Sequence, residues 1–383
     1  PYTDHWSVYG LVDWAVSDTI SVEFEGRYSK ESFELDRTIT TLCTINPPLF
    51  LSCDEITGPA PKPPIPGDTT VYNNLSGSVR SDFFTPKLTL NYQPNDDTLF
   101  YASAGKAQKP AGINTLSTSI RDIELLKFDP EKMWVYEAGW KATFDGNLGT
   151  LTFNGAVFFQ DYTDKQVQVV VPDPELGLIP NIENASSAEV LGQELQFSWA
   201  PPVDGLTLNL AYTHLDTEFD DYVTTSTTAR TIAELGNCVV VQIDPTDPDD
   251  VRCQIDYTGN DLERAPEHAL YASVDFTRPL FATGVDYTLQ FDADYQDERF
   301  VNATNYTILE DRWIANLRVG IESENWSLIA FADNVFDDDT IISGGTATPD
   351  FGAGFSIPPI IQVSSQLPPP RVIGVRANFE FGG

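Results

Sequence analysis

The sequence predicts an all-β chain whose antiparallel strands run up and down in the wall of a transmembrane β-barrel. Three observations predict this fold: apolar and polar residues alternate in segments of about ten residues, the breaks between segments are alternately short and long, and no run of 18 apolar residues exists. Successive side chains of a strand point to opposite faces, so each segment offers one face to hydrocarbon and one to water. Barrel walls between lipid and an aqueous lumen repeat this pattern in every strand, whereas a transmembrane helix needs about 20 apolar residues.

The alternation is clearest in the segment 285–296. Its odd-numbered residues, from Val285 to Tyr295, are apolar, and its even-numbered residues, from Asp286 to Gln296, are polar. We therefore expect the odd-numbered side chains to contact acyl chains and the even-numbered ones to line an inner cavity.

We expect about 13 strands in chain order. They lie at about residues 5–16, 20–34, 83–92, 98–107, 134–144, 150–171, 186–199, 206–219, 267–276, 285–299, 306–321, 326–335 and 371–381. Turn chemistry such as Asp145-Gly146-Asn147 closes the short connections. In an outer-membrane barrel the short turns face the periplasm and the long loops face outside. The first strand therefore descends toward the periplasm.

An odd number of strands predicts an incomplete barrel. Thirteen strands cannot close with every neighbour antiparallel, and bacterial barrels have even strand numbers. Within a membrane, an open edge leaves backbone groups without partners. We therefore expect residues 1–383 to form one partial barrel domain that does not close alone, with about nine strands missing on its N-terminal side.

The acidic composition of the chain argues against nucleic acid as a binding partner. The net charge of -35 repels nucleic acid. Acidity alone does not establish a cation site, but four carboxylates in one predicted outer loop, Asp244, Asp247, Asp249 and Asp250, are a weak calcium candidate because calcium prefers oxygen ligands. The loop lacks the ordered spacing and the Gly of an EF-hand, so a solvated loop is the simpler interpretation.

The four cysteines fall in two predicted outer loops. Three pairings are possible, and local pairing of Cys43 with Cys53 and of Cys238 with Cys253 is the simplest. Disulfides persist in oxidising compartments and at cell surfaces. Free buried thiols and a metal-binding role are the alternatives, although no zinc-type spacing is present.

Enzyme chemistry finds little support in the sequence. None of the three histidines, His5, His214 and His268, lies in a metal or catalytic-triad motif, and no phosphate-binding or dinucleotide-binding motif occurs. Inward-facing carboxylates such as Asp292, Asp294 and Glu194 offer a pair for acid–base catalysis in principle. A solvated channel wall is the simpler interpretation, so we predict no catalytic residue and no cofactor.

Several short segments resemble a known family. They have the order and spacing of strand and turn signatures in TonB-dependent outer-membrane receptors. The segments are Pro86–Tyr92, Lys109–Asn114, Tyr136–Lys141, Phe158–Asp164, Asp333–Asp337 and Pro370–Arg376, followed by Phe379 and Phe381. The resemblance runs from about residue 5 to residue 381.

This resemblance implies the C-terminal part of a 22-stranded barrel in the outer membrane of a Gram-negative bacterium. The implied function is TonB-dependent uptake of a scarce nutrient, most often a siderophore–iron complex. The implied partners are outer-membrane lipid, the TonB complex through a missing plug, a small-molecule substrate such as a metal chelate, and the assembly machinery. That machinery would read the aromatic residues Phe379 and Phe381, although Gly382 and Gly383 follow them here.

Two other functions fit the alternating pattern. A passive porin-like channel would have a complete, even-stranded barrel without a plug. A secreted all-β binding or adhesion protein would bury its apolar faces in a sandwich core and dissolve without detergent.

Overall fold

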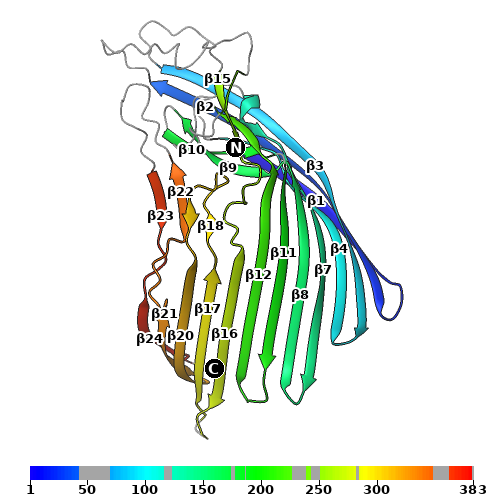
Figure 1. The fold of residues 1–383 in the computed structure, drawn as a ribbon, viewed down its shortest axis with the longest axis vertical. Helices are drawn as coiled ribbons and strands as arrows, with labels where there is room; N and C mark the ends of the chain where they lie inside the picture. The colour runs from blue at the N-terminus through cyan, green and yellow to red at the C-terminus, as the bar shows by residue number, and fades with distance from the viewer. Residues whose placement is uncertain are drawn as a thin grey trace.

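A computed structural model describes residues 1–42, 70–115, 123–173, 177–185, 187–226, 239–242, 251–281, 284–347 and 362–381. Within these residues one 13-stranded antiparallel sheet dominates, in the order β1-β2-β3-β4-β7-β8-β11-β12-β16-β17-β20-β21-β24. The all-β class, the number of strands and their up-and-down order are thus confirmed. The sheet forms a tall wall with short turns at its lower end and longer connections at its upper end (Figure 1).

The thirteen wall strands follow the predicted sequence segments. Their bounds are β1 (Tyr2–Ala15), β2 (Ile20–Leu42), β3 (Thr70–Asn95), β4 (Thr98–Lys109), β7 (Glu131–Gly146), β8 (Gly149–Thr163), β11 (Ser187–Ala200), β12 (Leu206–Asp221), β16 (His268–Pro279), β17 (Asp286–Gln296), β20 (Arg312–Ser323), β21 (Trp326–Asp333) and β24 (Val372–Phe379). Short and long connections alternate along this order, as predicted. In the described part of the chain, β1 and β24 are the two edges of the wall.

The predicted bounds of the long loop, about residues 35 to 80, were wrong, because both ends of this segment are strand. Strand β2 continues to Leu42 and β3 begins at Thr70, and these two residues are register partners. Above the wall, the hairpin is supported by a small cluster of buried residues, which are Leu35, Leu75, Ile113 and Leu126. Burial of these side chains stabilises paired strands beyond the predicted ends.

Two further strand boundaries differ from the prediction. Strand β8 ends at Thr163 because Asp164 adopts a φ of 55°, which interrupts an extended chain. The next residues form β9 (Gln166–Asp173), which pairs with β10 (Gly177–Asn184) outside the wall. Likewise, the predicted strand 306–321 begins only at Arg312.

Four other small sheets lie in the long connections of the described chain. These are β5 (Gly112–Ile113) with β6 (Lys127–Phe128), β13 (Val223–Ser226) with β15 (Val251–Asp256) and β14 (Val239–Gln242), β18 (Arg299–Phe300) with β19 (Ile308–Leu309), and β22 (Ser343–Ala347) with β23 (Gln362–Gln366). A single turn of 3₁₀ helix, η1, covers Ile123–Leu126. In the described ranges, no helix is long and apolar enough to cross a membrane.

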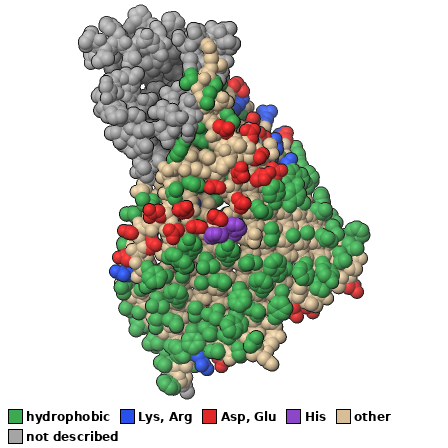
Figure 2. Space-filling model, viewed as in Figure 1, with side chains coloured by type: hydrophobic (Ala, Val, Ile, Leu, Met, Phe, Trp, Pro, Cys, Tyr) green, Lys and Arg blue, Asp and Glu red, His purple; other side chains and the backbone are tan. Residues whose placement is uncertain are grey.

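The apolar face of the wall is exposed. Its side chains include Phe100 at 48% exposure, Leu210 at 44% and Val319 at 48%. Figure 2 shows hydrophobic side chains as a broad band over the lower part of the molecule, with acidic side chains gathered above it. A contiguous apolar surface of this extent marks contact with lipid or another protein. Within the described residues no second sheet covers this face, so this part of the chain does not form a sandwich.

The larger cluster of buried hydrophobic residues lies at the upper end of the wall. Its members come from the upper parts of β11 and β12 and from the long connections: Val167, Val169, Ala185, Ala188, Val190, Phe219, Tyr222, Ile255, Tyr257, Leu262 and Ala303. This core holds the long connections together at the upper end of the wall, and β11 and β12 contribute to it side chains of their polar face, Ala188, Val190 and Phe219.

Candidate functional site

A row of polar side chains crosses the polar face of the wall. The row consists of successive register partners on neighbouring strands from β7 to β20: Thr143, Thr152, Ser198, Asn209, Ser273, Asp292 and Asn316. Ser198 Oγ donates to Asn209 Oδ1 at 2.8 Å, and Asn209 Nδ2 donates to Ser273 Oγ at 3.1 Å. Asn316 Nδ2 donates to Asp292 Oδ2 at 2.7 Å. The row forms a hydrogen-bonded polar band across the wall, with Ser273 buried and the other members partly exposed.

An arginine joins three strands on this face. Arg318 on β20 donates from Nη1 to Asp292 Oδ1 on β17 at 3.0 Å, and from Nη2 to Asp333 Oδ1 on β21 at 3.1 Å. The three side chains are about a quarter to a half exposed. Charge-assisted hydrogen bonds of this kind fix the register of adjacent strands.

The three carboxylates that the sequence offered as a catalytic pair do not form one. Asp292 is paired with Arg318, and Asp294 lies 4.0 Å from Arg312. Glu194 is on β11, three strands away from β17. This arrangement fits the predicted polar wall.

A buried arginine lies above the polar row. Arg299 is only 8% exposed, and its Nη2 donates to the carbonyl oxygen of Ile342 at 3.0 Å. Its Nη1 has no hydrogen-bond partner among the described residues. Burial lowers the pKa of Arg299, and the positive charge of Arg312 lowers it further. A buried N–H donor requires an acceptor, so this position suits an anionic or carbonyl group from outside the described chain.

Glycines on the polar face make room for aromatic rings. A Cβ on Gly139 would lie 2.8 Å from the Tyr101 hydroxyl, which donates to Glu137 Oε1 at 2.5 Å. A Cβ on Gly192 would lie 2.1 Å from the Phe158 ring. The glycines are thus required by the packing of the facing aromatic side chains.

The turn after β21 is organised by one buried asparagine. Asn334 has a φ of 51° and is 4% exposed. Its Nδ2 donates to the carbonyl oxygens of Asp338 at 2.8 Å and Pro369 at 3.1 Å, and its Oδ1 accepts from the Asp338 N–H at 2.9 Å. Asn tolerates the left-handed region and bonds the backbone locally, so it closes this turn against the segment that leads into β24.

The family follows from comparison with known proteins. The model of the family described as TonB dependent receptor-like, beta-barrel matches residues 2–335. The chain belongs to the TonB-dependent receptor β-barrel family. Its polar face is therefore the inner face of a barrel wall, and its apolar face is the outer one.

Solved structures of receptors and a transporter share this fold. The ferric yersiniabactin uptake receptor from Yersinia pestis has a TM-score of 0.69 and 16% identity over 99% of this chain and 46% of its own. The siderophore receptor from Acinetobacter baumannii has a TM-score of 0.63 and 17% identity over 98% of this chain and 43% of its own. The copper transporter OprC has a TM-score of 0.60 and 13% identity over 99% of this chain and 48% of its own. The chain thus spans less than half the length of these structures.

Several predicted sites of this TonB-dependent receptor barrel lie outside the described residues. They are the calcium candidates Asp244, Asp247, Asp249 and Asp250, the cysteines Cys43, Cys53 and Cys238, and the side chain of Cys253. Both disulfides and the calcium site therefore stay predictions.

The terminal aromatic residues of this TonB-dependent receptor barrel lie on its last wall strand and just beyond it. Phe379 pairs with Trp326 on β21 and is 63% exposed, and Phe381 is 93% exposed. Their ring centroids are 6.5 Å apart. Phe379 on the last strand and Phe381 just beyond it are therefore both exposed in the described chain.

One group of side chains was missed by the sequence reasoning. His214, Glu267 and His268 lie together on the outer face of the barrel wall. The two histidines are far apart in the sequence and become neighbours only through the register of β12 with β16. The one available signal in the sequence was that each histidine lies at one end of a segment in which apolar and polar residues alternate.

Proposed function

We propose that this chain is the barrel wall of an outer-membrane receptor that takes up a scarce nutrient in a TonB-dependent way. The substrate we favour is a small anionic metal chelate, a siderophore–iron complex being the first candidate. The observation that carries the proposal is the two-faced wall: an exposed apolar band on one side and a hydrogen-bonded polar row on the other. No step of this function needs covalent chemistry.

We also propose that residues 1–383 are the C-terminal portion of a longer barrel. Each edge strand, β1 and β24, has a partner on one side only within the described sheet. About nine further strands would complete a 22-stranded barrel, and a plug domain would fill it and contact TonB. The open edges support this proposal because strand edges are unsatisfied in lipid.

The buried Arg299 supports an anionic substrate class. Its Nη1, which has no hydrogen-bond partner among the described residues, and the neighbouring Arg312 bring two guanidinium groups together in an otherwise acidic molecule. Guanidinium groups pair well with carboxylate and catecholate oxygens.

A growth experiment tests the proposed function. The gene is deleted in its native bacterium, and growth is measured under iron limitation with a panel of single siderophores as the iron source. We expect loss of growth on one siderophore, restoration by the full-length gene, and no restoration in a strain that lacks TonB. Restoration without TonB would contradict the proposal.

A conductance experiment tests the porin alternative. The full-length protein is reconstituted in planar bilayers, and we expect no stable open channel because the plug fills the lumen. Large, steady conductance would instead support a passive channel.

We further propose that Phe379 and Phe381 serve as the assembly signal. Replacement of both with Ala is expected to lower the amount of heat-modifiable, folded receptor in outer membranes. The matched control is the pair Val375→Ala and Ile373→Ala, which removes apolar side chains from the same face of β24. Equal loss in both double variants would show a stability effect and not a signal.

A further inference from the structure

A cluster of potential metal ligands lies on the outer face of the wall. His214 near the end of β12 and His268 at the start of β16 are register partners, and Glu267 precedes His268. Figure 2 shows histidine side chains at the border between the hydrophobic band and the acidic side chains above it. The cluster is therefore on the face opposite to the polar row, at the upper border of the apolar band.

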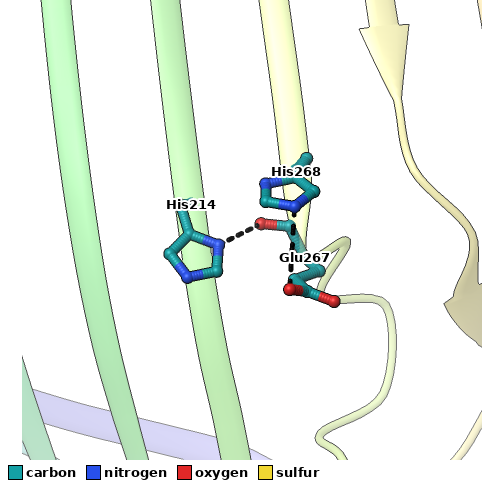
Figure 3. Close-up of side chains that lie close together, drawn as sticks. All are labelled: His214, Glu267 and His268. Atoms are coloured by element: carbon teal, nitrogen blue, oxygen red, sulfur yellow. Dashed lines mark hydrogen bonds and ion pairs between the residues drawn. The ribbon is translucent and has the colours of Figure 1, made fainter.

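The geometry of the cluster suits a single ion. Figure 3 shows His214 and His268 side by side, with the carbonyl oxygen of Glu267 directed at His214 and its carboxylate below His268. The imidazole rings are stacked with centroids 4.9 Å apart. One ligand atom from each residue lies within 4.8 Å of the others, and His268 Nε2 lies 3.6 Å from Glu267 Oε1. Ligands around a tetrahedral zinc ion are roughly 3.4 Å apart, so small side-chain rotations close the site.

Hydrogen bonds already orient both rings. Tyr212 Oη lies 2.9 Å from His268 Nδ1, which leaves His268 Nε2 facing the Glu267 carboxylate. Nδ1 of His214 lies 3.2 Å from the carbonyl oxygen of Glu267. A hydrogen bond to one ring nitrogen orients an imidazole and sets its tautomer, which is the usual support of a histidine metal ligand.

The surrounding charge favours a cation. In the loop just before Glu267, burial raises the pKa of Asp261, and the negative charges of Asp216, Glu267 and Glu218 raise it further. These carboxylates create a negative potential beside the cluster. A bound divalent cation would relieve their mutual repulsion.

We propose that His214, Glu267 and His268 bind one divalent transition-metal ion, with zinc as the reference ion. Two imidazoles and a carboxylate favour zinc, copper or nickel, whereas calcium and magnesium prefer all-oxygen sites. The ion ties β12 to β16 below the long connection that leaves Asp221.

The competing explanation is that these rings only belong to an interfacial belt. Amphipathic rings are common at this level of a membrane protein, and this role needs no metal. The two explanations differ in the effect of replacing a histidine with phenylalanine, because the ring stays and the ligand is lost.

Zinc titration of the untagged full-length protein in detergent tests the proposal. After removal of metals with a chelator, isothermal titration calorimetry is expected to show one zinc ion that is lost, or bound at least about tenfold more weakly, in His214→Phe and in His268→Phe. His5→Phe is the matched control, because His5 is exposed on β1 far from the cluster along the sheet, and it is expected to bind like the parent.

A spectroscopic readout separates ligation from a general change in structure. With Cu²⁺ as the probe, electron paramagnetic resonance is expected to show coupling to two imidazole nitrogens in the parent and to one in each cluster variant. Heat-modifiable migration in gels confirms that each variant is folded. Zinc affinity and copper spectra that are unchanged in both folded cluster variants, or no zinc binding by the parent, would overturn the proposal.

Discussion

Leu210 offers a direct probe of the surroundings of the apolar face. It lies in the middle of the apolar side of β12, paired with Phe197 on β11 and Ala272 on β16, and it is 44% exposed. In water, Leu210→Arg at such an exposed position would change the free energy of unfolding by about 0.5 kcal/mol or less. In a bilayer, the expected cost is much larger.

The expected cost has two parts. An arginine at the bilayer midplane of a barrel costs about 2–4 kcal/mol. Full burial of a leucine is worth about 1.5–3 kcal/mol, and lipid covers the 44% that the protein leaves exposed, which adds about 1 kcal/mol. We therefore expect Leu210→Arg to lower the free energy of unfolding in lipid by about 3–5 kcal/mol.

Urea unfolding of the full-length protein refolded into lipid bilayers measures this loss. Gln196→Arg is the matched control, because Gln196 is exposed on the inner face and pairs with Ala211, the residue after Leu210. We expect the control to cost less than about 1 kcal/mol. Equal costs for the two variants, or a negligible cost for Leu210→Arg, would refute the assignment of the outer face to lipid.

Three further predictions concern the inner face and the upper turn. Asp292→Ala removes one of the two carboxylates that pair with Arg318. We expect it to lower the free energy of unfolding by about 1 kcal/mol, because solvent exposure weakens the ion pair. No loss of stability in urea titrations would show that the ion pair is unimportant. Asn334→Ala removes three part-buried hydrogen bonds of a buried side chain and should cost about 2–3 kcal/mol of unfolding free energy, measured in the same way. A cost below about 0.5 kcal/mol would be incompatible with its role in the turn. Gly192→Ala forces the facing Phe158 ring to move and should cost about 1–3 kcal/mol of unfolding free energy. The control is Gly10→Ala, whose added Cβ meets no atom of the described chain within 4 Å and should be neutral. Similar melting temperatures for both variants would argue against the close packing.

The wall was predictable from the sequence because each of its faces meets a uniform environment. Residues 286–296 alternate strictly since every second side chain meets lipid and every other one meets water. Above the membrane this constraint ends. The upper parts of β2 and β3 were missed for this reason, and β8 was predicted too long because the alternation does not reveal the positive φ of Asp164.

Sequence patterns could not predict which side chains meet across neighbouring strands of the sheet. Asp292 was correctly expected on the inner wall, but its partner Arg318 depends on the register of β17 with β20. The same holds for His214 and His268, whose contact follows from the register of β12 with β16. A shift of one residue in that register would move one histidine to the inner face.

The central claim is that lipid covers one face of the wall and water the other. Single spin labels placed at each position from 286 to 296 of the full-length protein in bilayers test it most directly, with oxygen as the lipid-soluble relaxant and a nickel chelate as the water-soluble one. We predict that accessibility to oxygen peaks at the odd-numbered positions, and that the even-numbered positions are shielded from oxygen and reached by the chelate wherever the lumen is open. Odd-numbered positions that exclude both relaxants, or the absence of a two-residue period, would contradict the account.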